Sequence, residues 1–145
     1  MKALTIRQPH AWAVARGLKT IENRPWSVTY RGPVMIHAGQ VLGSALAFHE
    51  VTELAGRAGV EVPLLGQPGA PTETAFGAVI AVADLVRSHR WVECRHRCDP
   101  WAHPEKAHLR LANPRILAYP VPATGNTIMW NPSADLIAEV QAALR

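Results

Sequence analysis

The stretch that decides this chain reads Gly17-Leu18-Lys19-Thr20-Ile21-Glu22-Asn23-Arg24-Pro25-Trp26. It brings an amine, a carboxylate, a guanidinium and an indole close together, directly after the expected end of a helix. If the segment from Thr20 to Trp26 is extended, its side chains alternate between two faces, so Glu22, Arg24 and Trp26 share one face. Such a row suits the wall of a nucleobase pocket, because an indole stacks on bases and a guanidinium pairs with phosphate.

The same row also has a structural interpretation. Glu22 and Arg24 suit a solvated ion pair, and Trp26 suits an anchor in the core, since structural ion pairs are common and functional sites are few. In the functional interpretation, Lys19 and Glu22 are the catalytic candidates. A lysine near a carboxylate in a partly dry cleft can act as a base or nucleophile while the carboxylate positions water.

The stretch resembles the hallmark of the ASCH family (activating signal cointegrator homology), whose pattern is G-x-K-x-x-E-x-R-x-W. The residues that match its fixed positions are Gly17, Lys19, Glu22, Arg24 and Trp26. Residues 4–13 are similar to the family's opening, apolar-x-x-x-Q-P-W-A, with His10 where Trp or Tyr often stands. Residues 30–38 resemble the family's Y-R-G strand that ends in I-H-A, and residues 109–130 resemble the family more loosely.

The resemblance implies an α+β fold, namely a PUA-like small β-barrel with flanking helices and a cleft on one side. It further implies that residues 1–145 form a single ASCH domain. In such a cleft Gln8 would contact a base edge, Lys19 and Arg24 would contact phosphate, and Trp26 would stack on a base.

The resemblance also raises an enzymatic alternative. Some similar ASCH proteins hydrolyse an acyl group from modified cytidine, with a lysine that matches Lys19 and a threonine at the position of Glu22. A later glutamate completes their site, and Glu93 and Asp84 are the candidates for it here. Ribonuclease activity has also been proposed within the family, and Lys19, Glu22 and Arg24 would then serve as base, acid and phosphate clamp.

Periodicity and turn residues predict short strands and three helices around a curled sheet. The expected strands are residues 3–7, 20–23, 33–37, 76–86, 108–111, 116–118 and 125–130. The expected helices are residues 9–16, residues 43–58 and a last helix that Pro132 opens with Asn131 as its cap. Residues 59–74 are expected to form a loop, and Pro120-Val121-Pro122 is expected to lie outside any central strand.

Length and charge limit the number of domains and the kinds of partner that the chain can have. A chain of 145 residues suits one domain with one core. No apolar run approaches the ~20 residues that span a bilayer, and no signal peptide is evident, so we expect no membrane contact and a cytoplasmic location. The 15 Lys and Arg outnumber the 11 Asp and Glu, and the formal charge of +4 suits nucleic acid as a partner.

Basic and aromatic residues crowd one segment, which holds Arg87, Arg90, Arg95 and Arg97 with His89, His96, His103, Trp91 and Trp101. Arg87 and Arg90 would extend a nucleic-acid footprint beyond the cleft. The alternative is a solvated surface loop whose tryptophans fold back onto the core.

The cysteines lie in the same segment, as Cys94-x-His96-x-Cys98 followed by His103. Such ligands can hold zinc, but this spacing is a poor match to structural zinc sites, and a disulfide is disfavoured in a reducing cytosol. The sequence therefore favours two unpaired thiols, with no metal and no cofactor. His37 and His108, at ends of expected strands, are more often structural residues than bases.

The first functional hypothesis is a module that recognises RNA, single-stranded nucleic acid or a modified nucleoside in a basic cleft. The second is a hydrolase of the same fold, an amidohydrolase of N-acylated cytidine or a ribonuclease, that uses Lys19 and Glu22. A third is an adaptor whose cleft binds a protein, which the positive charge disfavours.

Overall fold

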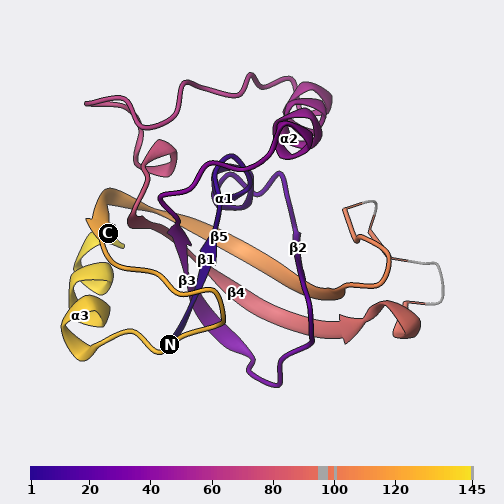
Figure 1. The fold of residues 1–145 in the computed structure, drawn as a ribbon. Coiled ribbons are helices and arrows are strands. Elements are labelled where there is room, and N and C mark those ends of the chain that lie inside the picture. The colour runs from indigo at the N-terminus through magenta and orange to yellow at the C-terminus, as the bar shows by residue number, and fades with distance from the viewer. Residues whose placement is uncertain (95–97, 100, 145) are drawn as a thin grey trace.

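The computed structural model of the chain describes residues 1–94, 98, 99 and 101–144. In that part, five strands form one mixed sheet in the order β1-β3-β4-β5-β2 (Figure 1). The strands are β1 (Lys2–Ile6), β2 (Ile21–Arg24), β3 (Gly32–Ala38), β4 (Ala78–Arg90) and β5 (Ala107–Pro122). The helices are α1 (His10–Ala15), α2 (Ala45–Arg57) and α3 (Ala134–Ala143), with short 3-10 turns at Thr72–Thr74 and Trp91–Glu93. The predicted α+β class is confirmed.

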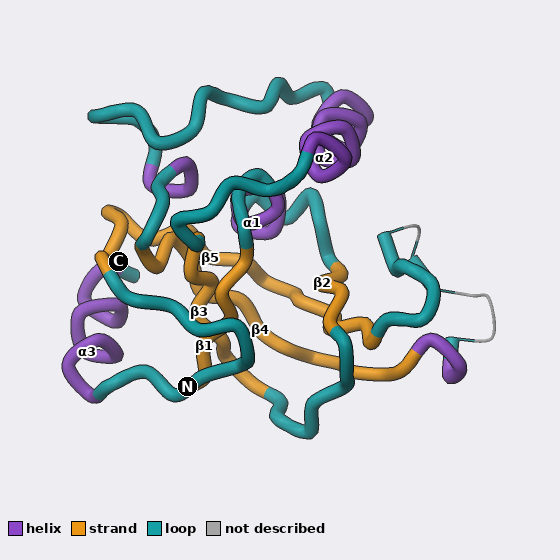
Figure 2. The backbone as a smooth tube through the Cα atoms, in the orientation of Figure 1, coloured by secondary structure: helices purple, strands orange, loops and turns teal. Residues whose placement is uncertain are grey.

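Helices cover both faces of the sheet. Side chains alternate along each strand, so Leu4 of β1 packs with Val14 of α1 on one face, while Met35 of β3 packs with Val140 of α3 on the other. Helix α2 contacts α1 through a separate apolar cluster, made of Trp12, Ala13, Val51 and Ala55. Figure 2 shows α1 between the sheet and α2. Trp12 is therefore a core residue.

Strands β4 and β5 are the longest strands of the sheet and form a hairpin in its middle. Its ladder shifts register between Val79 and Ala81, between Val82 and Asp84, and again after Leu85. Such bulges increase the local twist. The hairpin curves, and its tip extends beyond the other strands, with β2 paired to the tip half of β5 (Figure 1).

The predicted closure into a barrel is wrong for the described residues. Strands β1 and β2 are the two edges of the sheet, and no ladder joins them there. The free edge of β1 is instead met by the chain that leads to α3, where Ala3 and Trp130 exchange backbone hydrogen bonds of 2.9 and 3.0 Å. A single bridge at this place leaves a seam between β1 and β2.

Two strand predictions also need correction. Strand β5 runs without interruption through Asn113-Pro114 and includes Pro120 and Pro122, although the sequence predicted two short strands and a break. The prolines are tolerated because β2 pairs only with the first part of β5, up to Arg110, so the later part has one unpaired side. Strand β4 extends to Arg90, into the predicted basic loop.

The helix boundaries follow local capping. The side chain of Ser44 caps α2, and Ser133 caps α3 by accepting from the backbone N–H of Leu136 at 3.2 Å. The predicted cap Asn131 instead accepts a hydrogen bond from Lys2, so that prediction is wrong. None of the described helices is long and apolar enough to cross a membrane.

Candidate functional site

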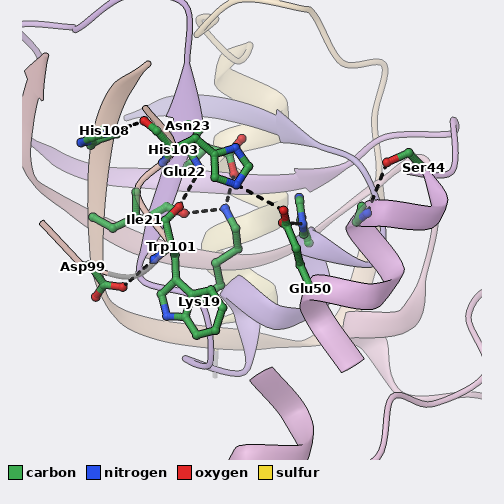
Figure 3. Close-up of polar contacts among 12 residues, drawn as sticks. Lys19, Ile21, Glu22, Asn23, Ser44, Glu50, Asp99, Trp101, His103 and His108 are labelled. Carbon is green, nitrogen blue, oxygen red and sulfur yellow. Dashed lines mark hydrogen bonds and ion pairs between the residues drawn. The ribbon is translucent and has the colours of Figure 1, made fainter. Parts of the chain in front are cut away.

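The charged residues of the Gly17–Trp26 stretch form one buried cluster. Oε2 of Glu22 lies 3.3 Å from Nζ of Lys19, and Oε1 lies 3.5 Å from Nε of Arg24. Lys19 also donates to the backbone carbonyl of Ile21 (Figure 3). Lys19 is 4% exposed and Glu22 is 9% exposed, so the cluster is not the solvated ion pair considered from the sequence.

The end of α1 fixes Lys19. The backbone N–H groups of Leu18 and Lys19 both donate to the carbonyl of Ala13, at 2.9 and 3.1 Å. Gly17 between them and the helix has a φ of +71°, a conformation that favours glycine. This turn sends the chain directly into β2, which carries Glu22 and Arg24 two residues apart on one face.

Glu22 is ionised at neutral pH. Burial raises the pKa of its carboxyl group, but the charges of Lys19 and Arg24 outweigh burial and hold this pKa below its ordinary value. A carboxylate in this state is a poor general acid, because it gives up its proton well below neutral pH. It supplies the counter-charge for the buried Lys19 and the largely buried Arg24.

A second carboxylate beside the cluster was missed by the sequence analysis. Glu50 of α2 lies 3.3 Å from Nε2 of His10 and 3.3 Å from Nε2 of His103. The contact with His10 is not aligned as a hydrogen bond. Burial first, and then the charge of Lys19, lower the pKa of His10. Figure 3 shows Glu50 reaching toward the Lys19 region from α2.

The carboxylates that the sequence suggested lie elsewhere. Asp84 accepts hydrogen bonds from Arg115 at 2.9 Å and from Asn113 at 3.1 Å. Glu93 pairs with Arg90 at the tip of the hairpin. Neither contact involves the buried cluster, so the further carboxylate that the structure does bring near it is Glu50.

Arg24 spans the seam between the two edges of the sheet. From β2 it donates through Nη2 to the carbonyl of Thr5 in β1 at 2.7 Å, and through Nη1 to the carbonyl of Thr127 at 3.1 Å. Its Nε faces Glu22 without a hydrogen bond among the described residues. One guanidinium thus connects β2, β1 and the chain before α3.

Two cavities adjoin at the contact between Arg24 and Thr127. The larger, about 660 Å³, is the Arg24 cavity; it is lined by Thr5, Arg7, Arg24, His37, Gly39, Gln40, Val41 and residues 123–127. The smaller, about 190 Å³, is the Trp26 slot; it is lined by Leu4, Arg24, Pro25, Trp26, Val28, Leu109 and residues 127–129. Because both share Arg24 and Thr127, a ligand that enters one reaches the wall of the other.

The remaining predicted binding residues are spread out. Trp26 is 61% exposed, so it is not an anchor in the core. Gln8 is fully buried, and its amide bonds to the carbonyls of Glu73 and Ala75 and to the backbone N–H of Trp12. Arg87 and Arg90 are exposed on the outer part of β4 and line neither cavity.

The expectation of two unpaired thiols is wrong. Cys94 and Cys98 are joined as a disulfide. Of the histidines that the sequence placed with them, His96 lies outside the described residues, and the imidazole of His103 pairs with Glu50.

Comparison with protein-family models matches residues 4–115 to the ASCH domain. A search of curated proteins found no match. The matched residues include the buried cluster, Arg7 and Trp26. Residues 123–127 of the Arg24 cavity and residues 127–129 of the Trp26 slot follow the matched range.

The buried cluster predicts a pH-dependent stability. We expect Glu22→Gln to lower the free energy of unfolding at neutral pH by about 3 kcal/mol, because it uncovers two buried cations. Since the folded-state pKa of Glu22 is lowered, its stabilisation is complete above pH 4.5 and is lost as the pH falls through the folded pKa. The difference in the free energy of unfolding between wild type and Glu22→Gln, measured by urea unfolding, should therefore become smaller as the pH falls.

The matched control is Glu53→Gln on α2. Glu53 is 54% exposed and pairs with His49 and Arg57 at 3.5 and 3.9 Å, so its removal should change the free energy of unfolding by less than about 0.5 kcal/mol. If the loss of unfolding free energy in Glu22→Gln stays constant down to acidic pH, the pKa of Glu22 is not lowered in the folded state.

Proposed function

Because the chain belongs to the ASCH domain family, we propose that it is a nucleic-acid-binding module that holds RNA or a modified nucleotide in the Arg24 cavity. Family membership is consistent with a PUA-like RNA-binding module. The observation that carries the proposal is the pairing of a cationic cavity with an aromatic slot through a shared wall.

The charge of the Arg24 cavity suits phosphate. The exposed guanidinium of Arg7 lines it and has no ion pair or hydrogen bond with the described residues. Arg24 adds a second guanidinium, whose charge Glu22 offsets in part. His37 adds no charge at neutral pH, because burial lowers the pKa of its imidazole. Arg7 is therefore the group best placed to pair with a backbone phosphate.

The Trp26 slot suits a base. It is lined largely by apolar side chains, and the indole of Trp26 is exposed. Stacking on an exposed aromatic ring tolerates every base, since every base has a π-face. In this arrangement the base lies against Trp26 while the phosphate reaches Arg7 across the shared wall of Arg24 and Thr127.

Removing the Arg7 guanidinium should weaken RNA binding without harming the fold. We expect Arg7→Ala to raise the Kd for a labelled single-stranded RNA about tenfold for every sequence tested, and to reduce the slope of log K against log salt by about 1. Fluorescence anisotropy over a salt series measures both. Arg57→Ala, which removes the same charge from α2 away from both cavities, is the matched control. Equal effects of the two variants would assign the binding to overall charge.

Removing the indole should separate stacking from phosphate contact. We expect Trp26→Ala to weaken binding by about 1–3 kcal/mol, the usual contribution of a stacked base, with little change in the salt slope. Because Trp26 is exposed, the thermal midpoint should change little. Trp26→Phe keeps a ring and should retain most of the affinity. If Trp26→Ala binds RNA like the wild type, the slot does not hold a base.

The hydrolase that uses Lys19 and Glu22 stays a prediction. The buried ammonium of Lys19 is held by Ile21 and Glu22, and Glu22 is ionised, which favours a structural role over a base exposed to substrate. We therefore expect no product from N-acylated cytidine or from labelled RNA, as followed by chromatography. Turnover by the wild type that disappears in a folded Lys19→Met variant would establish the enzyme instead.

A further inference from the structure

Four soft donor atoms converge at the tip of the β4–β5 hairpin. They are Nε2 of His89, Sγ of Cys94, Sγ of Cys98 and Nδ1 of His108, and all lie within 4.8 Å of one another. Nε2 of His89 lies 3.1 Å from each sulfur, and Nδ1 of His108 lies 3.1 Å from Sγ of Cys94. The two ring nitrogens are 3.2 Å apart.

Strand register explains why the histidines meet. His89 of β4 is paired directly with His108 of β5, and His108 is in turn paired with Asn23 of β2. Residues directly opposite in antiparallel strands point to the same face of a sheet. Cys94 ends the 3-10 turn that follows β4, so the chain brings its sulfur back over that face.

The orientation of His108 leaves a lone pair directed at the sulfurs. Its Nε2 lies 2.7 Å from the carbonyl oxygen of His103 and donates to it, so Nδ1 carries no proton in the neutral ring. The residue is completely buried. Metal-binding histidines show this arrangement: one ring nitrogen donates to a backbone carbonyl, and the other offers its lone pair to the metal.

The disulfide does not account for this convergence. It satisfies the two sulfurs, but it gives no reason for two imidazole nitrogens to lie 3.1 Å from them, because a disulfide has no proton to donate. The two ring nitrogens lie 3.2 Å apart and His108 is fully buried, so the contact needs either a proton on Nε2 of His89 or a cation between the two rings.

We propose that the reduced protein binds one zinc ion through His89, Cys94, Cys98 and His108. A dithiol supplies two electrons and two protons to the disulfide and itself becomes a disulfide. A phosphine supplies the two electrons and becomes a phosphine oxide, while water supplies the oxygen and the two protons, and in both cases the protein gains two thiols. On binding zinc, both thiols release their protons to solvent and coordinate as thiolates. Two thiolates offset the charge of the ion, and two neutral imidazoles complete a tetrahedral shell.

The donor set and its surroundings suit zinc. Two sulfurs and two imidazoles in a tetrahedral arrangement are a structural zinc set, whereas calcium and magnesium prefer oxygen. Tetrahedral ligands at about 2.0 and 2.3 Å from zinc lie about 3.3 to 3.5 Å apart for the nitrogen contacts, close to the observed 3.1 and 3.2 Å. The two sulfurs must separate to about 3.8 Å, which they can do only after the disulfide is reduced. An open hollow lined by Arg87, His89, Glu93 and the two cysteines gives the ion access from solvent.

The site would hold the segment that follows Cys98 against β2. Asp99 accepts a hydrogen bond from Thr20 at 3.1 Å. The backbone of Trp101 and of His103 bonds to the side chain of Asn23 at 2.9 and 2.8 Å (Figure 3). The imidazole of His103 then reaches Glu50. Zinc at the tip therefore fixes the segment that closes over β2 next to the Lys19–Glu22 cluster.

The test measures metal and thiols on the full chain, purified with a phosphine reductant and without chelator. We expect zinc near one per chain by elemental analysis, and cobalt substitution should give the visible bands of a tetrahedral site. Cys98→Ser and His89→Ala, both at partly exposed positions, should lose at least about tenfold in zinc affinity. His108 is buried, so its substitution is not relied on.

His103→Ala is the matched control, because it removes an imidazole from the same segment but keeps the carbonyl that orients His108. It should retain zinc. The proposal is overturned if folded, reduced protein holds no zinc, if the disulfide persists in the reductant, or if His103→Ala loses as much zinc as Cys98→Ser. Each result is independent of RNA binding, because the donors line neither the Arg24 cavity nor the Trp26 slot.

Discussion

The guanidinium of Arg24 is the interaction on which the rest of the structure depends. The described sheet has two edges that no ladder joins, and Arg24 donates from β2 to backbone carbonyls of β1 and of Thr127. A buried guanidinium requires a counter-charge, which Glu22 supplies while it also pairs with Lys19. The seam, the buried cluster and the two cavities therefore meet at one guanidinium that lies between two strands.

The residues of the Gly17–Trp26 stretch therefore fall into a buried group and an exposed group. Lys19 and Glu22 face the interior, where they balance charge, and the exposed Trp26 faces a slot. Arg24 belongs to both groups, because it seals the seam and lines both cavities. Such a residue cannot report on ligand binding by simple removal, since its loss would also open the fold. Arg7 lines the same cavity without such a structural bond, which is why the binding proposal rests on it.

The sequence predicted what depends on local periodicity. Glu22 and Arg24 share a face because alternation in a strand is a local property, and helices α1 and α2 lie within the residue ranges predicted for them. The prediction from sequence was wrong where two local signals compete, and it missed contacts that depend on strand register or on tertiary packing. Asn113-Pro114 suggested a break in β5, but a positive φ at Asn113 beside a bulge carries the strand through. Glu50 could not be placed with His10, because α2 meets that site only through tertiary packing.

The same limit explains why the sequence did not place His89 and His108 with the two cysteines. Spacing along the chain favoured His96 and His103, whereas the ladder of β4 and β5 selects His89 and His108, which are far apart in sequence and directly opposite in the sheet. Glu22 and Asn23 are successive residues of β2, so their side chains point to opposite faces. Glu22 lies on the face with the buried charges, and Asn23 on the other face bonds to the backbone of Trp101 and His103. The hairpin tip and the Lys19–Glu22 cluster are therefore joined through neighbouring residues of one short strand.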